Sequence, residues 1–220
     1  IVADADCHPF ERYHRPEQAR AWLAEHEPHL AEHIAELEFA DFRVLRHYSY
    51  FSERLLSPDR WACVGEAGVF VDPLYSPGTD FIGIGNGFVS RLVADDMAGR
   101  FDPDVAEELN RFGLRAARDG MNSLSGNADV FQHGKTMGSK LWWDFFSYWS
   151  FLCQYFAQGI YRLPLEQLRR FHRIGEQFFD LNEQANRLVR TWARLRGERL
   201  EPERKFVPGP LFPSILADKH

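Results

Sequence analysis

Residues 61–97, WACVGEAGVFVDPLYSPGTDFIGIGNGFVSRLVADDM, decide the fold that we expect for this chain. The apolar run at 61–64 predicts a short buried strand, and the run at 69–71 predicts a second one. A turn at 76–78 then leads into a helix that begins at Thr79 or Asp80 and ends before Gly99. Its apolar residues recur at helical spacing: Phe81, Ile82, Ile84, Phe88, Val89, Leu92, Val93 and Met97.

This order places a carboxylate, Glu66, just after a strand and a glycine-containing turn just before a helix. The first turn of a helix carries free backbone N–H groups and the positive end of the helix dipole, so it can hold an anion. A carboxylate can accept hydrogen bonds from the hydroxyls of a polyol. The pattern therefore suits a nucleotide cofactor with a polyol chain and an electron-accepting ring. An ordinary strand–turn–helix is the alternative.

The same stretch also matches a known motif, at positions Trp61, Val64, Gly65, Glu66, Ala67, Gly68, Phe70, Asp72, Pro73, Leu74, Ser76 and Gly78. It resembles the second flavin-binding motif of the FAD-dependent halogenases, which is similar to the motif of the wider group of FAD-dependent monooxygenases and geranylgeranyl reductases. The resemblance implies an α+β fold, the C-terminal part of an FAD-dependent monooxygenase-like fold, with a small antiparallel sheet region and a mostly helical C-terminal half. It also implies FAD as the cofactor, bound by Gly65, Glu66, Asp72, Pro73, Ser76, Gly78, Thr79 and Asp80.

Three residues depart from the halogenase pattern. Tryptophan halogenases have a catalytic Glu where this chain has Tyr75, and an aromatic residue there is closer to the phenol and pyrrole halogenases. Pro77 has no backbone N–H, so a halide in this turn has to rely on Gly78 and Thr79. Glu66 stands where the family usually has Asp, which adds one methylene next to the flavin ribityl chain.

The halogenases also have a GxGxxG nucleotide loop and a catalytic Lys, which the family places in an N-terminal half. This sequence contains no such loop. We therefore expect the chain to be the C-terminal part of a longer protein, with an N-terminal FAD-binding half as its partner. The catalytic residue is unknown from this sequence, and the chain alone should be inactive.

The function that the resemblance implies is an FAD-dependent halogenase-like oxidoreductase, which acts through reduced flavin and O₂ on an aromatic or acyl small molecule. A separate flavin reductase is then a further partner. One alternative is a flavin dehydrogenase or reductase of the geranylgeranyl-reductase kind. The other is a non-catalytic binding module on the same scaffold.

We divide the chain into residues 1–60, a helix and sheet segment; 61–99, the flavin motif and its helix; 100–196, a helical region; and 197–220, an irregular tail. In the first segment, Pro16 begins a helix that runs to about Glu38. Partial alternation at 39–51 predicts one or two strands. The side chains that we expect to be candidates for the substrate pocket are His47, Tyr48, Tyr50, Tyr75 and Trp142.

Four helical stretches are expected after Gly99. Asp102-Pro103 begins one of them, and a second runs from Ala128 towards Gly138. Residues 141–156, LWWDFFSYWSFLCQYF, form a helix that is apolar nearly all round, so it should be buried or line the pocket. Pro164 begins the last helix. We expect Leu181 and Leu188 among its buried residues, and Arg187 and Arg190 on its solvated face.

Composition excludes several classes of protein. The net charge of −6 disfavours a nucleic-acid partner. The three cysteines have no metal-ligand spacing, and reduced thiols together with the lack of a signal peptide predict a cytoplasmic protein. The histidine-rich segment at 26–33 lacks an acid–base motif, so no metal is expected. The aromatic stretch is too short and too polar to span a membrane.

Overall fold

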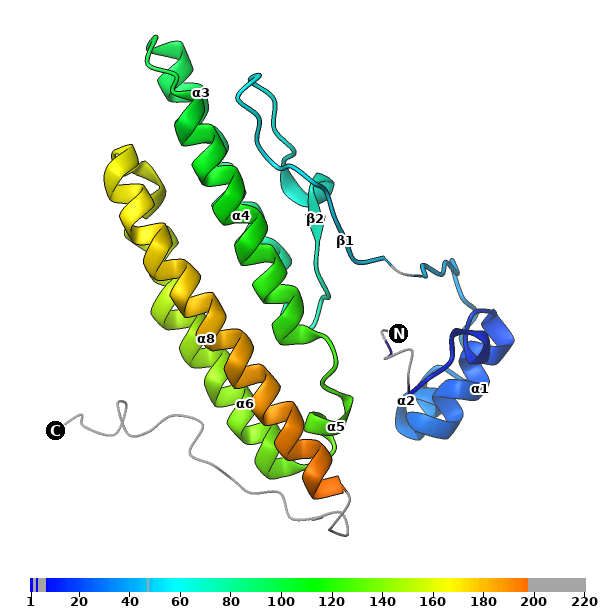
Figure 1. The fold of residues 1–220 in the computed structure, drawn as a ribbon. Coiled ribbons are helices and arrows are strands. Elements are labelled where there is room, and N and C mark those ends of the chain that lie inside the picture. Colours follow the sequence, from blue (N-terminus) through cyan, green and yellow to red (C-terminus); the bar gives the residue numbers. More distant parts are fainter. Residues whose placement is uncertain (2, 4–6, 47, 198–220) are drawn as a thin grey trace, which may run out of the picture. The chain divides into compact units, whose positions relative to one another are not determined.

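The computed structural model describes residues 1–197 except 2, 4–6 and 47, and the described chain is mostly helical with one small antiparallel sheet (Figure 1). This composition of elements is compatible with the predicted α+β class. The chain divides into two units, residues 1–48 and 49–220, and each is considered by itself. This boundary differs from the predicted one after residue 60. The predicted tail falls almost wholly on residues 198–220, which lie outside the described residues.

The N-terminal unit contains a short 3₁₀ helix, η1 (Phe10–Arg12), and two helices, α1 (Pro16–His26) and α2 (Pro28–His33). The prediction of one continuous helix to Glu38 was wrong. Pro28 has no N–H and disfavours a helical conformation at the residue before it, so the helix breaks at Glu27 (φ −134°, ψ 61°). Pro28 then becomes the first residue of α2.

The sheet is much smaller than predicted. β1 (Tyr50–Phe51) pairs with β2 (Val69–Phe70) in antiparallel register, Tyr50 opposite Phe70. The remainder of 39–51 contains no strand among the described residues. The predicted buried strand at 61–64 was also wrong: it contributes only a bridge between Leu56 and Ala62, and Trp61 is exposed.

The helix after the turn is α3 (Gly78–Met97), within two residues of the prediction, and Gly99 ends it with φ +67°. α4 (Pro103–Leu124) begins as predicted: the Asp102 carboxylate accepts a hydrogen bond from the Asp104 N–H (2.9 Å). These boundaries were predictable because caps and turns act within a few residues.

The rest of the chain consists of α5 (Ala128–Phe131), α6 (Gly134–Ser147), the π-helical η3 (Tyr148–Leu152), α7 (Cys153–Ala157), the 3₁₀ helix η4 (Ile160–Arg162) and α8 (Leu165–Gly197). The aromatic stretch therefore spans three elements. It is buried at Phe151 and Tyr155, but Trp142, Phe146 and Trp149 are about half exposed, so burial of the whole stretch is not found within this chain.

α4, α6 and α8 lie side by side as long rods (Figure 1). Contacts between α4 and α8 advance in the same direction, from Glu108–His172 to Asp119–Asn182, so these two helices run parallel. α3 packs on α4 in the opposite direction, with Phe81 next to Gly120 and Phe88 next to Gly113. The core lies between them and includes Leu109, Phe112, Phe151, Tyr155, Leu168 and Phe179.

Within the described residues, no helix has both the length and the apolar character that a membrane crossing requires.

Candidate functional site

Glu66 and the first residue of α3 lie next to each other. Glu66 is part of the 3₁₀ helix η2 (Gly65–Ala67), and its Oε1 lies 3.4 Å from the position that a Cβ on Gly78 would occupy. The Glu66 side chain is exposed, and the Tyr50 hydroxyl donates a hydrogen bond to its backbone carbonyl. A carboxylate and a helix N-terminus therefore share one exposed surface, and glycine at position 78 leaves room for the carboxylate.

The loop between β2 and α3 is folded by local hydrogen bonds. Asp72 Oδ1 accepts from the Leu74 N–H (2.9 Å), and the Ser76 N–H donates to the Pro73 carbonyl (2.8 Å). Tyr75 and Ser76 both have positive φ, +66° and +56°, which non-glycine residues rarely adopt. Such backbone conformations cost about 1–3 kcal/mol each and are frequent at ligand sites.

The first two amides of α3 have no acceptor within the helix. No side chain caps the helix, and Pro77 is its N-cap residue. The Asp80 and Phe81 N–H groups donate to the Pro77 carbonyl (both 3.1 Å), whereas the amides of Gly78 and Thr79 come too early for an intrahelical acceptor. The Ser76 amide, by contrast, is used inside the loop.

A cavity of about 520 Å³ lies next to this helix start. Tyr75, Pro77 and Asp80 belong to its lining, so the turn contributes to both surfaces. The Tyr148 hydroxyl donates to Asp80 Oδ1 (3.1 Å), which ties the start of α3 to the aromatic stretch. The remaining walls come from α3, α4, α6, η3 and α8: Phe81, Ile84, Asp119, Gly120, Ser123, Leu124, Leu141, Asp144, Phe145, Ser147, Trp149, Leu152, Phe178 and Asn182.

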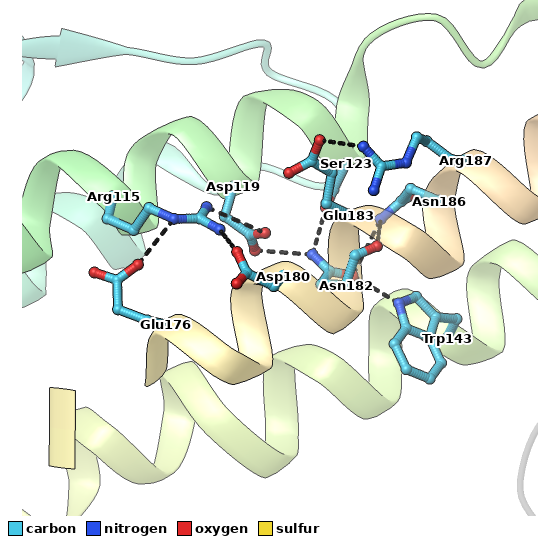
Figure 2. A network of polar contacts seen from close by, with 10 residues as sticks. All are labelled: Arg115, Asp119, Ser123, Trp143, Glu176, Asp180, Asn182, Glu183, Asn186 and Arg187. Atoms are coloured by element: carbon cyan, nitrogen blue, oxygen red, sulfur yellow. Dashed lines mark hydrogen bonds and ion pairs between the residues drawn. The ribbon is translucent and has the colours of Figure 1, made fainter. Parts of the chain in front are cut away.

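A hydrogen-bond network joins three helices at the polar end of the cavity (Figure 2). Asn182 of α8 donates to Asp119 Oδ2 (2.8 Å) and to Ser123 Oγ (3.0 Å), both on α4. Its Oδ1 accepts from the Trp143 indole N–H of α6 (2.6 Å). Burial raises the pKa of Asp119 to about 7, although the bond from Asn182 and the charge of Arg115 favour its ionised form. Asp119 is thus a buried carboxyl that titrates near neutrality.

A second buried acid, Asp144 of α6, pairs with Lys140 one turn earlier. Lys140 is completely buried, and burial lowers its pKa while the Asp144 charge opposes that change. Burial raises the pKa of Asp144 for the same reason. The phenol of Tyr75 faces Asp144, and burial followed by this negative charge raises the pKa of Tyr75.

Two of the other predicted pocket residues, Tyr50 and Trp142, are absent from the described lining of the cavity. Tyr50 contacts Glu66, and Trp142 is about half exposed. Tyr48 belongs to the N-terminal unit, so its position relative to the cavity is not assigned. His47 lies outside the described residues. Among the described residues, no group of three His, Cys, Asp or Glu side chains could hold a metal ion.

Sequence reasoning missed the acids and amides of the cavity. Asp119 continues the stripe formed by Val105, Leu109, Phe112 and Ala116, which are all buried. A carboxylate at the next position of an apolar stripe is the local signal that could have identified it. Asn182 gives no comparable signal, because its partners come from two distant helices.

A buried histidine connects α4 to α8 near the other end of these helices. With the ring neutral, His172 Nδ1–H donates to Glu108 Oε1 (2.7 Å), and Nε2 accepts from the Tyr155 hydroxyl (3.1 Å). Burial lowers its pKa from 6.5 to about 4, against the effect of Glu108. The folded protein therefore holds neutral His172 at a pH where the unfolded chain binds a proton.

This depressed pKa predicts how stability depends on pH. The contribution of His172 is complete above pH 6.5, the value of the unfolded chain, and is lost as the pH falls towards 4. We expect wild type to lose about 3 kcal/mol of unfolding free energy over this range relative to His172→Gln. Urea denaturation of both proteins across the range measures it. The opposite effect of Asp119 cancels in the difference, and parallel profiles of the two proteins would refute the prediction.

Comparisons of the chain with protein-family models, with curated proteins and with solved structures give no match.

Proposed function

We propose that this chain is the C-terminal part of an FAD-dependent halogenase-like oxidoreductase. In this proposal the flavin lies against Glu66 and the first turn of α3, and the adjoining cavity takes an aromatic or acyl substrate. The observation that carries the proposal is the position of the Glu66 carboxylate beside Gly78, at an uncapped helix start. A geranylgeranyl-reductase-like flavoprotein and a non-catalytic binding module stay as the alternatives that the experiment has to separate.

The residues of the motif suit one edge of a flavin. Glu66 offers an exposed acceptor to the hydroxyls of a ribityl chain, and the free amides of Gly78 and Thr79 offer donors to an electron-rich ring edge. Gly78 has no side chain between them, since a Cβ there would lie 3.4 Å from Glu66 Oε1. Asp72 and Pro73 fold the loop that presents them, and Ser76 stands at its bend.

FAD supplies the redox chemistry when it is bound in its reduced form. The residues of this chain then have three tasks: to orient the ring by hydrogen bonds at α3, to stabilise negative charge there through the helix dipole, and to keep water from the substrate. Tyr75 and Asp80 lie at the start of α3 and line the cavity, so they help to keep water from the substrate. A halide would have to take the amides of Gly78 and Thr79, for which it would compete with the ring edge.

The exposed aromatic side chains of the stretch 141–156 support a further contact with protein. Trp142, Phe145, Phe146 and Trp149 are each about half exposed. Exposed apolar patches of this kind are typical of surfaces that another protein segment covers. The proposed N-terminal FAD-binding half is the segment that we assign to them.

Turnover of the full-length protein tests the proposal. With reduced FAD, O₂ and chloride or bromide, we expect mass spectrometry to detect halogenated phenol, pyrrole or indole products. A hydroxylated product without halogen would keep the oxygenase and reject the halogenase. Reduction of a prenyl substrate would favour the geranylgeranyl-reductase alternative. Absence of any flavin complex would favour the binding module.

A further inference from the structure

The cavity has apolar walls and a polar end whose hydrogen-bonding capacity is incomplete. Phe81, Phe145, Trp149 and Phe178 supply aromatic surface, and the volume of about 520 Å³ falls within the range of small-molecule sites. Asp119 is 94% buried, since its exposed fraction is 6%, yet its Oδ1 has no hydrogen-bond partner among the described residues. Asp144 Oδ1 and Ser147 Oγ also have no partner within hydrogen-bond distance among the described residues, although the Tyr75 phenol faces Asp144, and all three residues line the cavity.

Buried acceptors without donors are rare, because each one costs the free energy of its lost hydration. Three of them around one cavity indicate that a bound molecule completes their hydrogen bonds. An ionised carboxylate oxygen can only accept and therefore needs a donor, whereas a hydroxyl can both donate and accept.

The charge around the cavity favours a cationic donor. The lining includes three carboxylates, Asp80, Asp119 and Asp144, and no Lys, Arg or His among the described residues. Lys140 neutralises only Asp144, through its other oxygen. Arg115 forms a long ion pair with Asp119 (4.0 Å to Oδ1) but donates its hydrogen bonds to Glu176 and Asp180, so Asp119 Oδ1 still lacks a donor (Figure 2). Asp119 and Asp144 are close enough to repel each other, so a cation between them relieves that repulsion.

We propose that the cavity binds a small aromatic primary amine, with its ammonium group on Asp119 and its ring among Phe81, Phe145 and Trp149. The ammonium supplies the donors that Asp119 Oδ1 and Ser147 Oγ lack, and Asp144 lies in the same lining. As a statement about the substrate this rests on the proposed function, but binding in the cavity can be measured without flavin.

Three probes with one ring and different end groups test the proposal: tyramine, tyrosol and 4-hydroxyphenylacetate, which end in an ammonium, a hydroxyl and a carboxylate. Calorimetric titrations of the full-length protein are run about one pH unit above the Asp119 pKa, so that this carboxyl is mostly ionised. We expect tyramine to bind roughly tenfold or more tightly than tyrosol, and 4-hydroxyphenylacetate to bind weakest.

Two variants and a control assign the binding to the cavity. Asp119→Asn keeps the size of the side chain and should lower tyramine affinity by about tenfold, to the level of tyrosol. Leu124→Trp fills the cavity and should abolish binding of all three probes. Asp129→Asn changes an exposed aspartate of α5 and should leave every affinity unchanged. Circular dichroism establishes that each variant is folded.

Equal binding of the three probes, tighter binding of the acid, no binding of tyramine to wild type, or full tyramine affinity in Asp119→Asn would each overturn the inference. Failure of the proposed function is a separate result. A protein that binds tyramine through Asp119 but forms no complex with FAD keeps the amine site and loses the flavoenzyme, and a protein that binds FAD but not tyramine does the reverse.

Discussion

Replacing Phe112 with alanine is expected to lower the free energy of unfolding by about 3–5 kcal/mol. Phe112 is 1% exposed and lies where α4, α7 and α8 meet. Its ring stacks on Tyr155 (centroids 4.5 Å apart) and on His172 (4.1 Å), and it also contacts Phe151 and Phe179. Truncation leaves a cavity among large rings that cannot move together, so both the burial and the packing of the ring are lost.

Urea denaturation followed by circular dichroism measures this loss. Phe146→Ala is the matched control, because it deletes the same atoms from a side chain that is 58% exposed on α6, and we expect it to cost less than about 1 kcal/mol. Equal losses for the two variants would mean that Phe112 does not occupy the centre of the core.

The Lys140–Asp144 pair gives the second large effect. Lys140→Met leaves Asp144 buried without its cation, and Asp144→Leu leaves the fully buried Lys140 without its anion. Each single change is expected to lower the unfolding free energy by about 3–5 kcal/mol, because an uncompensated charge is then buried. The double variant carries two apolar side chains of similar size, and it should be within about 1 kcal/mol of wild type.

A double-mutant cycle, again from denaturation curves, separates this coupling from the loss of side-chain packing. Additive losses in the double variant would show that the two side chains do not interact in the folded protein. In that case the charge count that supports a cationic ligand would also need revision.

The elements that were predicted correctly are those whose signals are local. The start of α4 follows from Asp102-Pro103, and the start of α3 follows from the turn before Gly78 together with the apolar spacing after it. The predicted strands failed because pairing depends on distant partners. Tyr50 and Phe51 pair with β2, whereas the described residues of 39–49 form no strand.

The buried face of α8 also could not be predicted from the apolar spacing of its own residues. Apolar spacing placed Leu181 and Leu188 on the buried side and Arg190 in solvent. Leu181 and Leu188 are instead exposed, and Asn182 and Asn186 are buried. Arg190 is half-buried and donates to Asn127 Oδ1 (3.2 Å). α8 packs here on polar residues of α4, and an asparagine that is paired in this way has no pattern in its own segment.

One part of the candidate site was predictable from the sequence, and the other part was not. The turn, the helix start and the carboxylate before them were predictable from residues 61–80, since the segment is continuous. The cavity was not, because Asp119, Asp144, Ser147 and Asn182 come from three helices and gain their roles only when these pack together.

The most direct test of the flavin proposal is a titration of the full-length protein with FAD, using variants of two glycines on α3. Gly78→Val puts a side chain against the Glu66 carboxylate, whereas Gly85→Val puts the same side chain where a Cβ meets nothing within 4 Å. The account predicts a yellow complex with wild type and Gly85→Val, and affinity lower by about tenfold or more with Gly78→Val. Undiminished FAD binding by Gly78→Val, or no flavin complex with wild type, would contradict it.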